Sequence, residues 1–213
     1  ENPHALATGL AGAGLTSWMR AVAQGIMRSY TPDQATIILI DPRKSNVGVV
    51  PEDTWLSAYA RVPGAISQVV TDLVGVLEGR QTPHGASQEA LATERFWSGR
   101  EFFVLVDGIA SWGNNMNPLM PLAPYVEQGQ ELGLHIVATA DMRQWSYQSQ
   151  GMGVLGKMVG MQTPIFIMNG HRSNGAIVPG VFADPQREGK GKLITRQGIV
   201  GALAGWTEPP VLA

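Results

Sequence analysis

The sequence predicts an α/β fold with a mostly parallel sheet flanked by helices and a β-hairpin near the C-terminus. Two observations lead to this prediction. Continuous apolar runs of strand length recur along the chain, and between them apolar residues return at the spacing of a helix. A chain that alternates strands and helices forms a parallel sheet, and ligands bind at the carboxyl ends of its strands.

Composition supports a folded domain. Of 213 residues, 44% are hydrophobic and 15% are charged, so we expect a single domain over residues 1–213 with a sizeable core. Cysteine is absent, which excludes disulfides and thiolate metal sites. The net charge of −2 gives no electrostatic reason to bind nucleic acid, and no apolar run has the length of a membrane span. Because the chain begins almost on its first expected strand, we expect it to be a fragment of a longer multidomain protein.

The first half of the chain contains five expected elements. Residues 4–8 form a short buried strand, and apolar residues at helical spacing predict a helix from 15 to about 29. The run at 35–40 is apolar throughout, which predicts a strand covered on both faces. A short strand is expected at 55–60. Pro63 then opens a helix whose apolar stripe extends over 66–77.

The second half continues the alternation, with a shorter helix at 88–97 and the most apolar strand at 101–107. A helix from 119 to about 131 is expected to end at Gly133, because glycine readily adopts the left-handed conformation of a helix C-cap. The remaining expected elements are a strand at 134–140, a polar helix-like stretch from 143 to about 161 interrupted by Gly151 and Gly153, a strand at 164–168, and a hairpin of strands 192–195 and 199–203.

A glycine-rich segment joins the first strand to the first helix. Residues 9–16, Gly-Leu-Ala-Gly-Ala-Gly-Leu-Thr, match the phosphate-binding pattern G-x-x-x-x-G-K-[ST] at every fixed position except the lysine, which is Leu15. Glycines let backbone N–H groups and a helix N-terminus face one concave site, but leucine cannot place a charge on the phosphates. The context predicts a P-loop NTPase fold with a degenerate loop, and the alternative is a strand-to-helix turn that never bound phosphate. The expected cofactor-binding residues of the loop are Gly9, Gly12, Ala13, Gly14, Leu15, Thr16 and Ser17.

Two expected strands end in an aspartate, and a carboxylate at such a position holds Mg²⁺ in nucleotide sites of this type. Asp107 is the better candidate because the most apolar strand presents it, and together with Thr16 it forms the expected metal site. Asp41 also fits a hydrogen-bonded turn aspartate. Many P-loop ATPases carry a glutamate after the metal-binding aspartate to orient the attacking water, but Gly108 has no side chain. Thr139 stands where a residue that contacts the γ-phosphate would lie, or it is an ordinary β-branched strand residue.

The remaining ionisable residues indicate less. The four histidines show no metal-ligand spacing, and His135 is expected to be a hydrogen-bonded core residue. Arg143 follows the strand that contains Thr139. It could reach a phosphate or a neighbouring domain, or it could be a solvated arginine at a helix end.

Taken together, these segments resemble the FtsK/SpoIIIE-type ATPase domains of the type VII (ESX) secretion motor, the EccC family. The similarity covers nearly the whole chain and includes the modified loop, the run at 30–43, the strands at 103–107 and 133–138, and the segment 191–198. The resemblance implies a RecA/FtsK-like fold, and ATP and Mg²⁺ as cofactors if the loop is competent. In that family several such domains lie in tandem on a membrane-anchored chain that faces the cytosol, and the degenerate loop and terminal hairpin favour the C-terminal one.

The resemblance implies three functions. The first is a degenerate nucleotide-binding domain that acts in substrate recognition and regulation, and the second is an active ATPase domain powering protein export. The third, an FtsK-like DNA translocase domain, is disfavoured by the near-neutral charge. The implied partners are secreted helical-hairpin (WXG100-type) substrates, bound through a C-terminal signal, and neighbouring ATPase domains of the same motor. The implied location is the cytoplasmic face of the inner membrane, with membrane contact only through the rest of the chain.

A helical export signal would need an apolar groove, and methionine and aromatic residues suit such adaptable surfaces. Trp145 and Tyr147 lie two positions apart, so on a helix one of them is expected to be partly exposed. The alternative for each candidate is a place in the core. The expected partner-binding residues are Leu119, Met120, Leu122, Trp145, Tyr147 and Met152.

Overall fold

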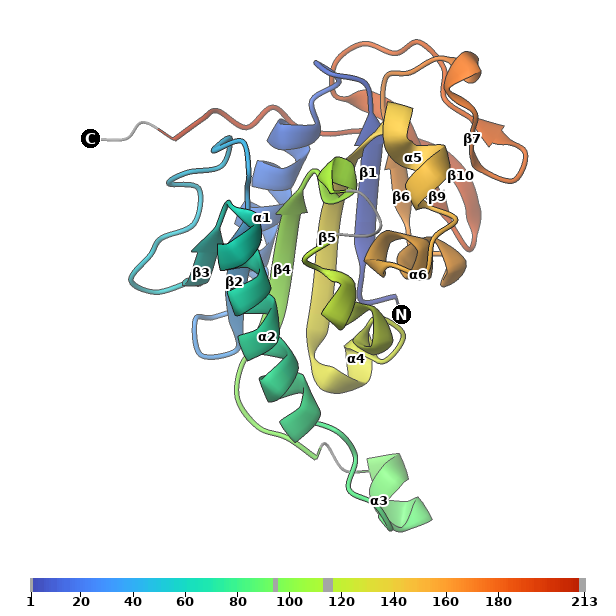
Figure 1. The fold of residues 1–213 in the computed structure, drawn as a ribbon. Helices are drawn as coiled ribbons and strands as arrows, with labels where there is room; N and C mark the ends of the chain where they lie inside the picture. Colours follow the sequence, from blue (N-terminus) through green and yellow to red (C-terminus); the bar gives the residue numbers. More distant parts are fainter. Residues whose placement is uncertain (1, 94–95, 113–116, 211–213) are drawn as a thin grey trace.

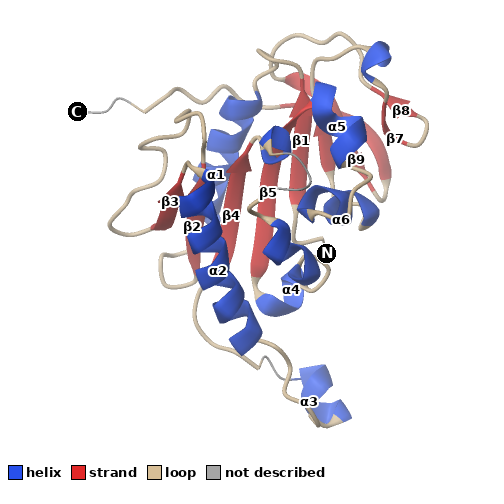
Figure 2. Ribbon diagram, viewed as in Figure 1, coloured by secondary structure: helices blue, strands red, loops and turns tan. Residues whose placement is uncertain are grey.

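The computed structural model describes residues 2–93, 96–112 and 117–210. Over these ranges the chain forms one large sheet with helices on both faces and one small sheet (Figures 1 and 2). The strands of the large sheet are β1 (Ala5–Gly9), β2 (Ala35–Ile40), β3 (Leu56–Ala60), β4 (Glu101–Asp107), β5 (Leu134–Asp141), β6 (Ile165–Ile167), β9 (Lys190–Thr195) and β10 (Gly198–Leu203). The small antiparallel sheet consists of β7 (Ala176–Val178) and β8 (Val181–Phe182).

The large sheet has the strand order β10-β9-β6-β1-β5-β4-β2-β3. The strands from β6 to β3 in this order all run parallel to their neighbours. By contrast, β9 pairs with β6 in the antiparallel sense and forms a hairpin with β10. The carboxyl ends of six strands therefore meet at one edge of the sheet, the edge that carries the glycine loop. The mostly parallel sheet and the C-terminal hairpin confirm the predicted fold class.

The helices lie in two layers. On one face lies α1 (Leu15–Ser29), and on the other lie α2 (Pro63–Gly79), α4 (Gly129–Leu132), α5 (Met142–Gln148) and α6 (Val154–Gly160) (Figure 1). In β2, Ile37 and Leu39 join the apolar cluster of the α1 face, whereas Ile38 and Ile40 join the cluster of the α2 face. Each such buried side chain contributes about 1.5–3 kcal/mol to folding, which explains why this strand is apolar at every position.

Most expected elements occur where the sequence places them. The first helix, the strands at 35–40 and 101–107 and the terminal hairpin agree with their predicted positions to within two residues. The stretch from 143 to 161 divides into α5 and α6 around Gly151 and Gly153, as expected. Gly156 is required in α6, since a Cβ there would lie 1.7 Å from the carbonyl oxygen of Gly151. No helix in the described ranges is long and apolar enough to cross a membrane.

The predicted continuous helix from 119 to 131 is wrong. The structure has the 3₁₀ helix η3 (Met120–Tyr125) followed by the short helix α4. Pro124 lies inside η3, and proline both lacks the N–H group of an α-helical bond and clashes with the preceding turn. The predicted cap is confirmed, because Gly133 ends α4 with a φ of 65°.

The helix expected at 88–97 is shorter in the structure. It is α3 (Gln88–Thr93), which projects away from the sheet in Figure 1, and residues 94–95 of the expected helix lie outside the described residues. Two further 3₁₀ helices, η1 (Ile109–Ser111) and η4 (Arg172–Asn174), follow β4 and β6. Of these, η1 lies at the same edge of the sheet as the glycine loop, because it comes directly after the carboxyl end of β4.

Candidate nucleotide site

The glycine loop between β1 and α1 is a tight turn that needs glycine at two positions for steric reasons. Gly14 is the N-cap of α1 and has a φ of 98°, a conformation that residues with a Cβ rarely adopt. A Cβ at Gly9 would lie 2.9 Å from the Cβ of Ala13. The turn is closed by the Ala13 N–H, which donates to the Leu10 carbonyl at 3.0 Å. The loop therefore leads through a tight turn with a left-handed glycine into the N-terminus of a fifteen-residue helix, the position at which helices bind phosphate.

Beside this loop lies an open cavity of about 380 Å³. Six of the seven expected loop residues, Gly12 to Ser17, contribute to its wall, whereas Gly9 does not. The cavity is lined by Leu10, Ala11, Gly12, Ala13, Gly14, Leu15, Thr16, Ser17, Arg20, Arg43, Ser45, Glu188 and Trp206.

Leu15 occupies the lysine position of the pattern and packs as an apolar residue. It is partly buried against a small cluster that includes Phe166 and Met168. Leu193 and Ala202 of the terminal hairpin contact the same cluster. The leucine therefore helps to fix the hairpin to the loop, and it brings no charge to the cavity.

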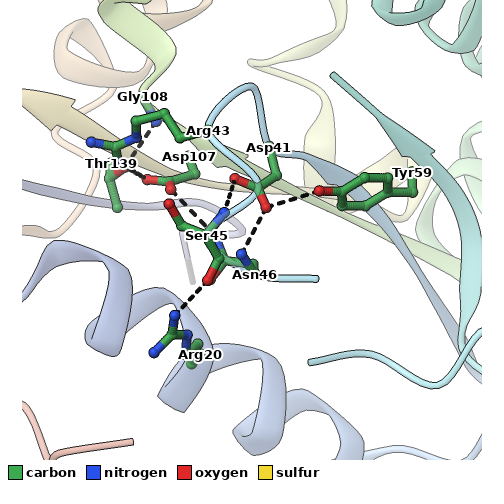
Figure 3. A network of polar contacts seen from close by, with 9 residues as sticks. All are labelled: Arg20, Asp41, Arg43, Ser45, Asn46, Tyr59, Asp107, Gly108 and Thr139. Carbon is green, nitrogen blue, oxygen red and sulfur yellow. Dashed lines mark hydrogen bonds and ion pairs between the residues drawn. The ribbon is translucent and has the colours of Figure 1, made fainter. Parts of the chain in front are cut away.

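Asp107, the expected metal ligand, is buried with 1% of its surface exposed and is already paired. Its Oδ1 lies 2.6 Å from Nη2 of Arg43 and accepts a hydrogen bond from Oγ1 of Thr139 at 2.8 Å. Nδ2 of Asn46 donates to its Oδ2 at 3.3 Å (Figure 3). A guanidinium group stands where a divalent cation would have to approach, so in this arrangement the carboxylate does not fit a Mg²⁺ site. In the described part of the chain, no three histidine, aspartate or glutamate side chains gather as a metal site.

The position of Thr139 indicates a supporting role. Its side chain is 1% exposed, and its hydroxyl donates to Asp107 while it accepts from the Gly108 N–H at 2.9 Å. It is not part of the cavity wall. The hydroxyl therefore orients the aspartate and the turn after β4.

Gly108 is fixed by the turn that it occupies. Its φ is 90°, and a Cβ would lie 2.7 Å from Oγ of Ser111. A glutamate at this position would meet both the strained conformation and the clash. The conformation of this turn therefore excludes a water-orienting acid at position 108.

Asp41 is a turn aspartate, which confirms the second of its two expected roles. Its carboxylate is fully buried and accepts from the N–H groups of Ser45 at 3.0 Å and Asn46 at 2.7 Å. The hydroxyl of Tyr59 donates to it at 3.1 Å (Figure 3). Burial and the nearby Asp41 carboxylate raise the pKa of Tyr59 to about 12. Together these contacts fix the loop that carries Arg43.

Sequence reasoning did not identify five residues of the cavity wall, because they come from segments far apart in the chain. Arg43 and Ser45 follow β2, Glu188 precedes β9, and Trp206 follows β10. Arg20 is a buried charge on α1, and no signal in the sequence distinguishes it from an exposed helix arginine.

The segment after β10 closes over the start of α1. Thr207 donates its N–H to Oγ of Ser17 at 2.8 Å, and Nη1 of Arg20 donates to the Thr207 carbonyl at 3.4 Å. The hydroxyl of Ser17 is therefore engaged by this segment.

The six expected partner-binding residues do not form one exposed surface. Leu119, Leu122 and Trp145 lie in the core with at most 1% exposure, and Nε1 of Trp145 donates to the Ile177 carbonyl at 2.7 Å. These three cannot contact a partner in this structure. Met120, Tyr147 and Met152 are exposed, and the expectation that one of the Trp145 and Tyr147 side chains is exposed is confirmed, with Tyr147 at 72%.

The two other ionisable candidates have ordinary contacts. Arg143 is exposed and forms an ion pair with Asp141, with Nη2 and Oδ2 2.5 Å apart, and it does not line the cavity. His135 lies 2.9 Å from Glu101 through Nε2 and 3.1 Å from the Pro3 carbonyl through Nδ1. It is hydrogen-bonded, as expected.

No protein-family model matches the chain. Among curated proteins, the ESX secretion system protein EccC of Thermomonospora curvata is 29% identical over 196 residues, or 92% of this chain. The ESX-4 secretion system protein EccC4 of Mycobacterium tuberculosis is 28% identical over 212 residues, or 99% of this chain. The chain spans 15% and 17% of the lengths of these two relatives.

Solved structures give the same result. The cytoplasmic domain of the T. curvata type VII secretion ATPase EccC superimposes with a TM-score of 0.91 at 28% identity, covering 97% of this chain and 24% of that one. ATPases 2 and 3 of T. curvata EccC in complex with a signal sequence peptide superimpose with a TM-score of 0.89 at 28% identity, covering 97% and 37%. The chain is therefore a relative of the EccC proteins of type VII (ESX) secretion systems and has the fold of their ATPase domains.

Proposed function

We propose that this domain is a degenerate ATPase domain of a type VII secretion motor, which recognises substrates and regulates the motor and does not itself hydrolyse ATP. Hydrolysis needs a charge on the phosphates, a metal ion and an oriented water molecule. Leu15 provides no charge, and Gly108 provides no group for the water. The loss of one such contribution costs on the order of 10²-fold or more in rate.

The pairing of Asp107 with Arg43 is the observation that carries this proposal. The carboxylate that would hold Mg²⁺ is buried, bonded on both oxygens and neutralised at 2.6 Å by a side chain of the same domain. Opening the site to a metal would break this ion pair, and an unpaired buried charge is costly. The loop and its cavity remain, which supports a role for nucleotide as a bound ligand and not as a fuel.

The relatives support a set of partners for this domain. The T. curvata structure holds a signal sequence peptide, which supports peptide recognition by this domain as well. We assign it the C-terminal signals of secreted helical-hairpin (WXG100-type) substrates, and as further partners the neighbouring ATPase domains of the same motor. Residues 1–213 would be one domain of that longer chain, held at the cytoplasmic face of the inner membrane by its other parts. The exposed Met120, Tyr147 and Met152 are the candidates for peptide contact among the residues named from the sequence.

Two assays on the full motor chain test this proposal. The first measures phosphate release after the P-loop lysines of the other ATPase domains have been replaced by alanine, and the expected result is turnover at background. The second titrates a labelled peptide with the last twenty or so residues of the WXG100-type protein encoded beside the motor, and saturable binding is expected at micromolar concentration, a typical strength for a transient contact. Turnover above background, or no peptide binding, would overturn the proposal.

A further inference from the structure

Two arginines that the phosphate-binding pattern does not include line the cavity beside the glycine loop. Arg20 comes from the second turn of α1, and Arg43 comes from the loop after β2. Leu15, at the position where the pattern requires lysine, carries no charge. The cavity has therefore lost its usual cation and has two others on its wall.

Arg20 is buried but not saturated with hydrogen bonds. Only 9% of its surface is exposed, and its Nη atoms donate to the carbonyls of Thr207 and Ser45 (Figure 3 shows the Ser45 contact). Its Nε is buried and has no hydrogen-bond partner in the described part of the chain. An unsatisfied donor on a buried cation is costly, so the Arg20 side chain keeps hydrogen-bonding capacity that the described residues do not use.

Arg43 connects the cavity to the buried carboxylate. Its Nη2 is 2.6 Å from Oδ1 of Asp107, while 59% of its side chain is exposed and contributes to the cavity wall. A guanidinium group has five N–H donors in a planar fork, so it can bind a carboxylate with one edge and a phosphate with another. In P-loop sites Mg²⁺ performs this bridging between phosphates and carboxylate. Arg43 therefore has the charge sign of the metal and contacts the carboxylate that the metal would contact.

We propose that this cavity binds a polyphosphate, such as the triphosphate of ATP, without a divalent metal ion. Arg43 replaces Mg²⁺ between the phosphates and Asp107, and Arg20 supplies a second cation in place of the missing lysine. The N–H groups of the loop and of the first turn of α1 bind the remaining phosphate oxygens. Among the residues that line the cavity, Glu188 is the acid and Arg20 and Arg43 are the two cations, so the lining carries a net positive charge. The inference deepens the proposed function, because it names the form in which a non-hydrolysing domain would hold its nucleotide.

The experiment compares ATP binding by isothermal titration of the full motor chain, with the P-loop lysines of its other domains replaced by alanine. One titration is done in excess EDTA and the other in excess MgCl₂, and sodium tripolyphosphate is the second ligand. We expect an affinity in EDTA that equals or exceeds the affinity in MgCl₂, because Mg²⁺ in solution binds the same phosphate oxygens and competes with Arg43 for them. Affinity at least about tenfold higher in MgCl₂ would overturn the proposal, because a bridging metal would then be needed.

Two variants separate the roles of Arg43 and Asp107. Arg43→Gln is expected to weaken ATP and tripolyphosphate binding in EDTA by about tenfold or more, since it removes a phosphate-binding cation. Asp107→Asn frees Arg43 from its partner, so binding in EDTA should be retained or tightened. If Asp107 is instead a metal ligand, Asp107→Asn abolishes binding in MgCl₂, and that outcome contradicts the proposal. Should Arg43→Gln fail to fold because it leaves Asp107 unpaired, the Asp107→Asn result decides.

Arg143→Gln is the matched control. It removes an exposed arginine at the same edge of the sheet that pairs with Asp141 and does not line the cavity. Its affinity for ATP should equal that of the unmodified chain. If Arg143→Gln and Arg43→Gln lose affinity equally, the loss reflects only the lower net positive charge, and that result would overturn the assignment of Arg43. Absence of binding in both buffers would also overturn it, while peptide recognition would stand. Metal-dependent ATP binding without ATP hydrolysis would contradict this inference alone, whereas ATP hydrolysis by the domain would contradict the proposed function.

Discussion

His4 should make the stability of the domain fall in mild acid. The side chain is buried just before β1, with 3% of its surface exposed. Its Nδ1 accepts the N–H of Ile136 at 2.9 Å, and its Nε2 lies 2.7 Å from the Val126 carbonyl oxygen. Because a backbone N–H can only donate, Nδ1 carries no proton in the folded state. The ring is therefore neutral, with its proton on Nε2, and it connects β1 to β5 and to the segment before α4.

The magnitude follows from the pKa. Burial lowers the pKa of His4 from 6.5 to about 4, although the hydrogen bond to Val126 opposes this change. Between these values the unfolded chain binds a proton that the folded chain does not, so the free energy of unfolding rises with pH. The stability is fully present above pH 6.5 and is lost as the pH falls towards 4. The difference between the two pKa values corresponds to about 3 kcal/mol, an upper figure for one group.

Urea unfolding at a series of pH values between 4 and 7 measures this effect. His4→Gln removes the titrating group, so its free energy of unfolding should vary less with pH than that of the unmodified domain, whatever its absolute stability. His84→Gln is the control, because His84 is exposed in the loop before α3. The plot of the free energy of unfolding against pH should differ in slope between His4→Gln and the unmodified domain. It should have the same slope for His84→Gln and the unmodified domain. Identical pH slopes for His4→Gln and the unmodified domain would refute the reasoning.

Three further predictions concern single positions. Gly108→Ala should lower the free energy of unfolding in urea by about 1–3 kcal/mol, because the turn has a φ of 90°; a change within error would contradict the steric argument. Gly156→Ala should unfold the domain or lower the free energy of unfolding by at least about 3 kcal/mol in the same measurement. Gly160→Ala, which has open space around its Cβ, should be neutral or stabilising by up to about 1 kcal/mol. Equal effects of the two variants would contradict the clash with the Gly151 carbonyl oxygen. Trp145→Ala should cost about 3–5 kcal/mol, while Tyr147→Ala should leave the melting temperature unchanged and weaken signal-peptide binding by about 1–2 kcal/mol; unchanged affinity by titration would exclude Tyr147 from the peptide surface.

The fold could be predicted because burial on two faces leaves a strong local pattern. Strands β2 and β4 are apolar at nearly every position, and the apolar stripe of α2 repeats at helical spacing. The one wrong helix came from giving apolar spacing more weight than Pro124, whose backbone restriction prevails locally. Local patterns thus specify elements, except where a proline interrupts them.

The candidate site could be predicted only in its local part. The glycine loop is contiguous, so its backbone path follows from the sequence. Arg43 and Asp107, in contrast, are 64 positions apart, and Arg20 and Thr207 are 187 apart. These pairs form because the parallel sheet brings the ends of β2 and β4 to one edge, and because the terminal hairpin returns the chain to α1. No spacing rule within one segment encodes such contacts.

The most direct test of the central claim is phosphate release by the full motor chain with the P-loop lysines of its other ATPase domains replaced by alanine, measured with and without Asp107→Asn in the absence of substrate peptide. If Asp107 is committed to Arg43 and takes no part in hydrolysis, the two turnover values should agree within about twofold. If Asp107 instead holds a catalytic metal ion, turnover attributable to this domain should fall on the order of 10²-fold or more, and the account would be contradicted.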